Sequence, residues 1–297
     1  MPKLNVQQNN QNVIQAFKNA LAIGNLKGII ASDGNNNFST AGSNRNLLDN
    51  PWFTVNQRGA ATVSSVGYYL DRWYSYNNYT VTANGITTTS AGSFDQTLES
   101  ALKTALNGQT VTMSAKLADG TVYSATGTYY SAYGSTYAIG SGGGITFYIT
   151  GDGKARYTFG NNLSIRAVKL ELGSHSTLAN DVPPDYSEEL RKCKYYFERV
   201  KTAGNALSLG IGYNDGYNTM YGVMKIEPKR VTPSLSGSSL LIGTTSLNTT
   251  SSSKTIYSFG SDGTVVMQIV ATNAFGTNQP YRFGLPSNGY IDFSADL

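Results

Sequence analysis

Hydrophobic and polar residues alternate with a period of two through much of the chain. In TVTMSAKLADGTVYSATGTYY, apolar positions from Val111 to Leu117 alternate with Thr, Ser and Lys and lead into Asp119-Gly120. The same arrangement recurs around Asp152-Gly153 and Asp262-Gly263. Alternation predicts half-buried strands, and an Asp-Gly pair between two of them predicts a hairpin whose turn residues both take positive φ. The chain is therefore predicted to be mainly β, with antiparallel strands that form a sandwich or barrel.

A helical period appears in PPDYSEELRKCKYYFERV, residues 183–200. Asp185 and Glu188 have the spacing of a capping box. An apolar face then repeats over the following residues, and it predicts a helix that separates two β modules. That face is made of Leu190, Cys193, Tyr196 or Phe197, and Val200.

A second helical period lies near the start of the chain, in residues 6–23, and Gly24 follows it as a stop signal. A helix of this length is marginal alone in water, so its apolar face needs a partner. That partner is either the protein's own sandwich or, for self-association or docking, another chain of a larger particle. The residues expected to mediate oligomerisation or docking into a larger particle are Val13, Ile14, Phe17 and Leu21, with Ala20 on the same face.

These patterns divide the chain into three predicted parts. Residues 1–43 hold the short helix and a Gly-, Asn- and Ser-rich linker over Asn25 to Ser43. Residues 44–182 form the first β-sandwich, and residues 183–297 form the second helix with a smaller β module.

Composition narrows the choice of partners. The formal charge is +4, from 3 basic and 1 acidic residues before residue 44, 9 and 8 through residue 182, and 10 and 9 afterwards. Because no segment clusters Lys and Arg, nucleic acid is not an expected partner. No stretch approaches the roughly 18 apolar residues of a membrane span, and no signal peptide is recognisable, so synthesis in a cytoplasm without membrane insertion is expected. Cys193 is the only cysteine, which excludes an intrachain disulfide.

Five segments occur in a characteristic order along residues 44–297. They are NLLDNPWFTVNQRG (46–59), GYYLDRWY (67–74), LSIRAVKLELGSHST (163–177), LRKCKYYFERV (190–200) and NGYIDFSADL (288–297). Together they resemble the β-sandwich modules of bacteriophage tail-fibre and related virion appendage proteins. In that group the first segment opens a carbohydrate-binding-like jelly roll, an "LDRW" strand follows, and a "VKLELG" strand closes it.

The resemblance implies structural roles for the aromatic residues of these segments. Trp52 and Phe53 are expected to enter the first strand and close one end of the sandwich after a turn at Asn50-Pro51. Trp73 is expected in the core, with Asp71 and Arg72 at a strand edge or paired nearby. The resemblance also implies a homotrimer, since fibre proteins are commonly trimeric, located on a virion as a head or tail fibre.

The residues that catalysis would need are scarce, so the protein is not expected to be an enzyme. His175 is the only histidine and falls in a loop-like stretch, while Cys193 lies on an apolar helix face and is expected to be buried. Asp95 and Glu99, at i and i+4 of an expected helix, are interpreted as a solvated face rather than the acid and base of a glycosidase. One His and one Cys cannot complete a zinc site, so neither a metal nor a cofactor is expected. The Gly-rich AIGSGGGITF lacks the Lys-Ser/Thr of a phosphate loop and is interpreted as a hairpin tip.

Tyrosine is abundant instead, with 21 residues. It gathers in WYSYNNYTV (73–81), GTYYSAYGSTYAIG (127–140) and GIGYNDGYNTMYG (210–222). Tyr among Asn, Ser and Gly is typical of recognition surfaces, and sugars suit such surfaces, although Tyr also packs in strands for structural reasons alone. The residues predicted to bind a ligand are Tyr213, Asn214, Asp215, Tyr217 and Tyr221.

Two functions of different classes follow from the sequence. One is a virion fibre or appendage subunit that attaches to host-surface glycan. The other is a structural capsid or tail decoration subunit that binds only virion proteins, through residues 1–43 among others. A depolymerising enzyme is a third interpretation, disfavoured because no acid and base pair stands out.

Overall fold

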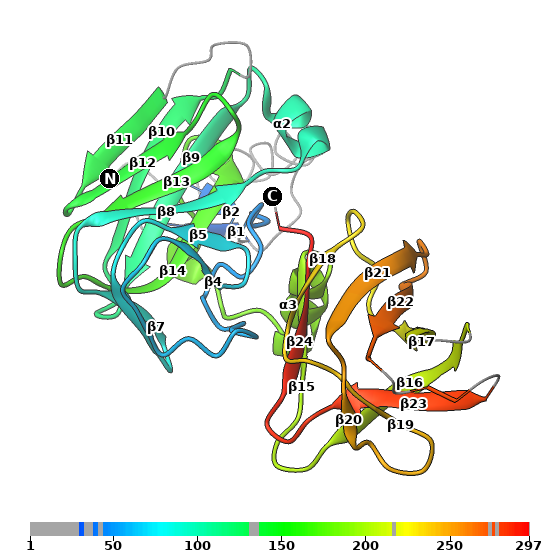
Figure 1. Cartoon of the computed structure of the whole chain (residues 1–297). Helices are drawn as coiled ribbons and strands as arrows, with labels where there is room; N and C mark the ends of the chain where they lie inside the picture. The colour runs from blue at the N-terminus through cyan, green and yellow to red at the C-terminus, as the bar shows by residue number, and fades with distance from the viewer. Residues whose placement is uncertain are drawn as a thin grey trace, which may run out of the picture.

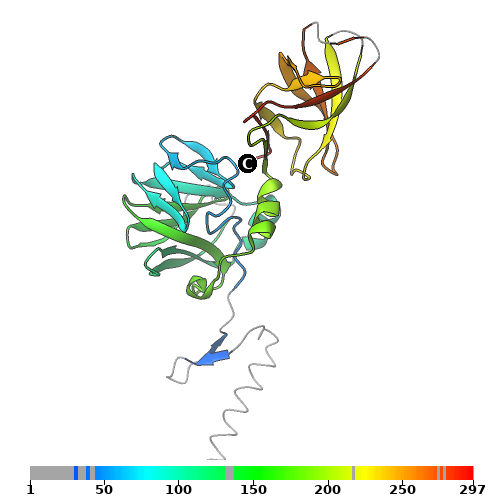
Figure 2. The same cartoon turned by 90° about the horizontal axis from the view of Figure 1, so that it is seen from below.

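Most of the described part of the protein consists of two β modules with a helix between them (Figure 1). The computed structural model describes residues 30–32, 38–40, 44–130, 137–215, 218–272, 275–276 and 279–296. The predicted helix over residues 6–23, with Val13, Ile14, Phe17 and Leu21, lies outside the described residues. Within the predicted linker, strand β1 (Ile30–Ser32) pairs antiparallel with β2 (Phe38–Thr40), and Figure 2 places this pair apart from both modules.

The first module is a sandwich of two six-stranded antiparallel sheets, and it confirms the prediction of a mainly β fold with a β-sandwich. Jelly-roll connectivity stays a prediction. The first sheet has the order β10 (Val122–Thr128), β9 (Thr110–Leu117), β14 (Ser164–Leu172), β7 (Gly85–Thr88), β6 (Tyr79–Thr82) and β3 (Thr62–Val63). The second has the order β11 (Tyr137–Gly142), β12 (Ile145–Ile149), β13 (Lys154–Phe159), β8 (Gly92–Thr97), β5 (Trp73–Ser75) and β4 (Gly67–Leu70).

The second module combines a three-stranded and a seven-stranded antiparallel sheet around its own core. The smaller sheet has the order β15 (Phe197–Lys201), β24 (Tyr290–Ser294) and β18 (Ser234–Gly237). The larger has the order β20 (Thr249–Thr250), β19 (Leu241–Gly243), β23 (Pro280–Leu285), β16 (Leu207–Asn214), β17 (Thr219–Lys225), β22 (Thr264–Val270) and β21 (Ser253–Phe259).

All three predicted Asp-Gly hairpins are present, joining β9 to β10, β12 to β13 and β21 to β22. Their turn type differs from the prediction, because only the glycine of each pair has positive φ. Each glycine N–H donates to the carbonyl three residues before it, as in a type I turn followed by a left-handed glycine. At Gly263 a side chain would also clash, since a Cβ there would lie 2.1 Å from the carbonyl oxygen of Ile226. The predicted hairpin tip in the Gly-rich stretch is formed by Gly143-Gly144, both at positive φ.

Aromatic side chains fill the core of the first module. Trp73 is fully buried, as predicted, and its ring lies 5.4 Å from that of Phe53 and 6.0 Å from that of Tyr157, measured between centroids. Phe94 continues the cluster against Phe53 at 6.3 Å. Aromatic rings of this size bury enough apolar area to dominate the energetics of a core.

The expected placement of Trp52 and Phe53 in the first strand is wrong. Both residues lie in a turn before β3, and Phe53 has a φ of 57°, which an extended strand does not allow. This conformation sends the two rings to different clusters. Phe53 joins the core, whereas Trp52 packs with Ala167 and Leu178 in a separate small cluster.

Buried charges hold a strap over the first sheet. The strap runs from Gly173 to Asp181 and includes the 3-10 helix η1 (Leu178–Asn180). Lys169 Nζ, on β14, donates to Thr177 Oγ1 at 2.8 Å and to Asp181 Oδ1 at 2.9 Å. Glu171, two residues along the same face, accepts the backbone N–H of Thr177 at 2.8 Å. The strap is thus tied to β14 by charge-assisted hydrogen bonds.

Both predicted helical patterns in the described region need correction. Helix α3 (Tyr186–Lys194) begins where expected, with Asp185 Oδ1 accepting the N–H of Glu188, but it ends before Phe197, which opens β15. The apolar residues from Leu190 to Val200 are therefore divided between a helix and the strand that follows it. Asp95 and Glu99 do not share a helix face: Asp95 is buried in β8, and Glu99 precedes α2 (Ser100–Leu106).

No helix in the described segments is long and apolar enough to cross a membrane.

Candidate functional site

The tyrosines predicted to bind a ligand lie on the outer face of the seven-stranded sheet. Tyr213 on β16 is opposite Tyr221 on β17, and Tyr213 is 55% exposed. The ring of Tyr221 meets that of Tyr257 on β21 edge-on at 4.9 Å. Gln268 Nε2, on β22 between them, donates to the Tyr221 hydroxyl at 3.4 Å. We call Tyr213, Tyr221 and Tyr257 the aromatic strip.

The other predicted ligand-binding residues are not all on this surface. Asn214 is fully buried, and its Nδ2 donates to the carbonyl of Gly276 at 2.6 Å. Asp215 follows the strand, where its N–H donates to the carbonyl of Thr219 at 3.2 Å, and it remains exposed. Tyr217 lies outside the described residues. Tyr257 belongs to the aromatic strip, and Gln268 lies beside it; the sequence analysis missed both residues. The two-residue period of β21 and β22 could have placed them on the exposed face.

An aliphatic row runs beside the aromatic strip. Ile211 pairs with Val223, which pairs with Val266, so three neighbouring strands present branched side chains on one face. Ile211 and Val223 are exposed, whereas Lys225 and Arg282 place charges on neighbouring positions of this face. The outer face thus offers flat rings with hydroxyl and amide groups on one row, and branched apolar side chains with Arg282 opposite Ile211 on the next.

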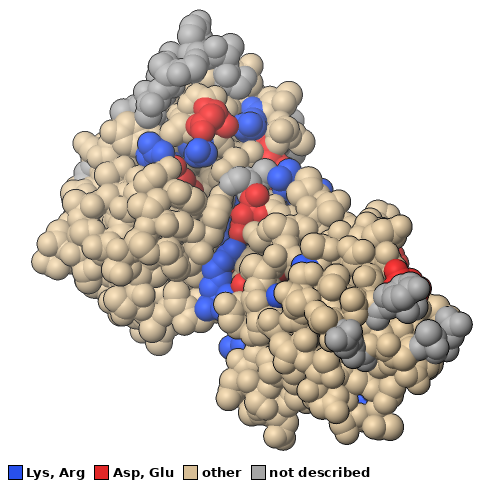
Figure 3. Space-filling model, viewed as in Figure 1, with Lys and Arg blue, Asp and Glu red and all other residues tan. Residues whose placement is uncertain are grey.

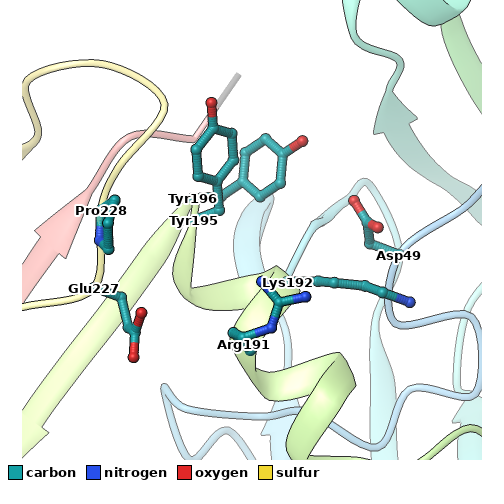
Figure 4. Close-up of a pocket in the computed structure, with 7 residues that line it drawn as sticks. All are labelled: Asp49, Arg191, Lys192, Tyr195, Tyr196, Glu227 and Pro228. Atoms are coloured by element: carbon teal, nitrogen blue, oxygen red, sulfur yellow. The ribbon is translucent and has the colours of Figure 1, made fainter. Parts of the chain in front are cut away.

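A cleft of about 340 Å³ opens at the junction between the modules (Figure 4). Arg191 and Lys192 project into it from α3, with Asp49 on the opposite side and Glu227 and Pro228 from the second module. Two of the charged residues that line it are paired: Lys192 Nζ donates to Glu189 Oε1 at 2.6 Å, and Asp49 accepts a hydrogen bond from Arg72 at 3.1 Å. The remaining lining residues are Tyr195 and Tyr196.

Four of the five ordered segments, residues 46–59, 67–74, 190–200 and 288–297, meet at this junction. Gln57 spans it: its Nε2 donates to Asp71 Oδ1 at 2.9 Å and to the Phe197 carbonyl at 2.8 Å. The guanidinium of Arg58 lies 3.4 Å from the centre of the Phe197 ring and pairs with Asp296. In Figure 3 a line of Lys, Arg, Asp and Glu side chains follows the seam between the two modules.

A second cation–π contact strengthens the same seam. The Arg72 guanidinium lies 3.4 Å from the centre of the Tyr196 ring and bonds Asp49 at 3.1 Å, so the predicted pairing of Arg72 is present. The Tyr196 hydroxyl donates to Glu99 Oε1 at 2.9 Å. On the side of the second module, Arg199 of β15 donates two hydrogen bonds of 2.7 Å to Asp292 of β24. Desolvated cation–π contacts and bidentate pairs are among the stronger polar interactions in proteins.

Asn50 holds together the turn of residues 50–55 in the first ordered segment. Its Nδ2 donates to the carbonyls of Val55 and Asp71, and its Oδ1 accepts the N–H of Val55 at 2.9 Å. Its backbone N–H donates to Glu189 on α3 at 2.8 Å, and its carbonyl accepts the Trp73 indole N–H at 2.9 Å. A φ of 49° suits asparagine better than most residues. Residues of the first two ordered segments, 46–59 and 67–74, thus form part of a joint between the modules.

Asp71 makes the stability of this joint depend on pH. Burial raises the pKa of Asp71 to about 6, although Arg58 and the hydrogen bonds from Gln57 oppose the rise. The folded state therefore holds a proton more tightly than the unfolded state, whose pKa is near 3.8. The contribution of Asp71 to stability is fully present below the unfolded pKa and is lost as pH rises through about 6. The difference between the folded and unfolded pKa values of Asp71 corresponds to roughly 3 kcal/mol in the free energy of unfolding at low pH.

We expect Asp71→Asn to remove this pH dependence. Between pH 4 and pH 7 the stability of the natural protein relative to the variant should fall by about 2.4 kcal/mol, measured by urea unfolding across the range. Asp119→Asn serves as the control, because Asp119 lies in an exposed turn, where a hydrogen bond from Thr121 lowers its pKa, so the trend should have the opposite sign. A relative stability of the Asp71 variant that stays constant with pH would contradict the assignment.

Reactive groups do not converge in the described part of the chain. Cys193 is buried, as predicted, and burial raises the pKa of its thiol far above the ordinary value, which disfavours the nucleophilic thiolate. His175 is exposed, and its Nδ1 hydrogen-bonds the hydroxyl of the adjacent Ser174 at 2.9 Å. The described residues contain no group of three or more His, Cys, Asp or Glu that could hold a metal ion.

Comparison with known proteins adds no family to this description. No protein-family model matches the chain, and neither curated proteins nor solved structures show a significant similarity to it.

Proposed function

We propose that the protein is a non-enzymatic subunit of a bacteriophage fibre or surface appendage that attaches to glycan on the host surface. The observation that supports this proposal is the aromatic strip, in which Tyr213, Tyr221 and Tyr257 present rings beside the Gln268 amide. Sugar rings stack their apolar faces on such aromatic rings, while neighbouring hydroxyl and amide groups bond the sugar hydroxyls. The ordered segments that resemble virion appendage modules provide the biological setting.

Attachment would require the protein to be held on the particle. In this proposal residues 1–43 bind other virion proteins, and copies of the chain form a homotrimer located on the virion. Multiple copies raise the overall strength of attachment, because each further contact becomes intramolecular after the first. Weak individual sites are then sufficient for stable adsorption to a cell.

A purely structural decoration subunit is the second candidate function. The aliphatic row favours it, since Ile211, Val223 and Val266 offer continuous apolar contact across three neighbouring strands, with Arg282 opposite Ile211. In this alternative the outer face binds another virion protein. The two functions differ in what the same face should recognise.

The double substitution Tyr213→Ala and Tyr221→Ala is expected to reduce binding of the labelled protein to intact host cells by about tenfold or more. Tyrosines at the centre of a contact commonly contribute over 1 kcal/mol each, and 1.4 kcal/mol is one factor of ten. The measurement is a saturation-binding isotherm on cells, repeated after enzymatic removal of surface glycan. Tyr186→Ala is the matched control, because Tyr186 is 53% exposed against 55% for Tyr213 and lies on α3.

Full binding by the double variant would refute this site, and failure of the natural protein to bind host cells would favour the structural subunit. Sedimentation of the same samples tests the trimer, which a monomer at working concentration would contradict. Circular dichroism of each variant verifies that a loss of binding is not a loss of fold.

A further inference from the structure

A line of polar and aromatic side chains crosses the outer face of the second sheet of the first module. Strand register sets Tyr68 opposite Tyr74, Tyr74 opposite Asp95, Asp95 opposite Arg156, and Arg156 opposite Tyr148. The line therefore runs across β4, β5, β8, β13 and β12, with a carboxylate and a guanidinium in its centre and tyrosines at both ends. Residues directly opposite each other on one face of a sheet interact through their side chains.

A cleft of about 220 Å³ lies at the β4–β5 end of this line. Within it the rings of Tyr68 and Tyr74 meet edge-on at 5.0 Å, and those of Tyr74 and Tyr76 meet edge-on at 5.0 Å. Tyr76, at the outer end, is 44% exposed. We call this the tyrosine cleft, and its lining residues are Tyr68, Tyr74, Tyr76, Asp95, Thr97 and Lys154.

The polar floor of the tyrosine cleft is fixed in place. Asp95 is only 2% exposed, and it accepts two hydrogen bonds from Arg156, at 2.7 Å and 2.6 Å. Arg156 in turn lies 5.5 Å from the centre of the Tyr76 ring. A carboxylate has about four acceptor positions, so Asp95 retains acceptor capacity beyond the two bonds to Arg156. Preorganised polar groups beside aromatic walls are typical of small-molecule sites.

The charges around the tyrosine cleft balance each other. The positive charge of Arg156 matches Asp95, and Lys154 pairs with Asp152 at 2.9 Å. A charged ligand would therefore meet no net opposite charge to offset its desolvation. An uncharged ligand with an apolar face and many hydroxyl groups fits both the rings and the polar floor.

We propose that the tyrosine cleft binds an uncharged oligosaccharide. One sugar ring stacks against Tyr76 and Tyr74, and its hydroxyls bond Asp95, Thr97 and Lys154. The site lies in the first module, separate from the aromatic strip of the second, and it does not depend on the virion role proposed above. The protein would then have a sugar site on each of its two modules.

The test is a calorimetric titration of the full chain with neutral oligosaccharides, namely glucose, galactose, mannose and N-acetylglucosamine oligomers. Sialyllactose and an oligogalacturonate supply the acidic comparison. We expect saturable binding of at least one neutral oligomer, weakened about tenfold or more in Tyr76→Ala and largely retained in Tyr76→Phe, which keeps the ring. Tyr130→Ala is the matched control, because the exposed fraction of Tyr130, 43%, is close to the 44% of Tyr76, and Tyr130 does not line the cleft.

Three results would overturn the proposal. One is the absence of saturable neutral-sugar binding up to about 10 mM, where even a Kd of about 1 mM would be evident. Another is undiminished affinity in Tyr76→Ala. The third is binding of acidic oligomers alone. A variant that loses sugar binding but still binds host cells through the aromatic strip would support the cleft and the strip as separate sites.

Discussion

Arg58→Met is expected to destabilise the joint between the modules by about 3 kcal/mol, because it leaves buried carboxylates without their cation. Arg58 pairs with Asp296, lies 3.7 Å from Asp71 and covers the Phe197 ring. Methionine keeps much of the apolar packing and removes only the charge and hydrogen bonds. In calorimetry, the unfolding temperatures of the two modules should then lie further apart in Arg58→Met than in the natural protein.

The assignment of each transition is straightforward, because the chain has two tryptophans and both, Trp52 and Trp73, lie in the first module. Tryptophan fluorescence therefore reports that module alone, while calorimetry reports both. Arg191→Met is the control, since Arg191 is exposed at the edge of the junction cleft. Unfolding of Arg58→Met that coincides with that of Arg191→Met would contradict a coupling role for Arg58.

Lys169→Met is expected to cost the first module about 3–5 kcal/mol, the usual penalty for removing one partner of a buried ion group. Lys169 and Glu171 have fully buried side chains, and Asp181 is nearly buried beside them. Without the ammonium, Glu171 and Asp181 face each other in a medium of low dielectric constant. Urea unfolding followed by tryptophan fluorescence measures the loss, and Trp52 lies close to the strap through its contact with Leu178.

Lys116→Met provides the comparison for Lys169. Lys116 reaches the same strap, where its Nζ donates to the Ala179 carbonyl at 3.2 Å, but it has no carboxylate partner among the described contacts and is partly exposed. Its replacement should cost less than about 1 kcal/mol. Equal losses from the two substitutions would show that the strap, and not the buried charge group, sets the stability.

Local sequence signals predicted much of the β architecture. The three Asp-Gly hairpins formed because each glycine takes a conformation that other residues avoid, and this information is contained in two residues. Burial of Cys193 also followed from the apolar face on which it lies, whereas burial of Trp73 was implied by the resemblance. The helix start at Asp185 was predictable for the same reason, since a cap is a contact between residues close in sequence.

Features that depend on distant contacts could not be predicted in this way. The apolar period through Val200 suits a helix, but pairing of β15 with β24 converts its last part into a strand. Asp95 seemed to belong to a solvated helix, whereas it is held inside a sheet by Arg156, a residue 61 positions later. The period of β21 could place Tyr257 on the exposed face, but its contact with Tyr221 depends on how β21 lies beside β22, where the register shifts between Ile256 and Ser258. Register between strands is set by the whole fold, and so it was hidden from a local pattern.

Strand β24 gives the chain a fixed order of assembly during synthesis. It is the central strand of the three-stranded sheet, yet it is made nearly ninety residues after its partner β15. The first module and α3 are complete in sequence by residue 194, so they leave the ribosome while the second module is still unfinished. Asp292 and Asp296, the acidic partners of Arg199 and Arg58, are translated last among the groups of the joint. Until Asp292 and Asp296 have been made and have left the ribosome, Arg199 and Arg58 lack their carboxylate partners, and the seam is held only by contacts such as those of Arg72 with Tyr196 and of Gln57 with Phe197.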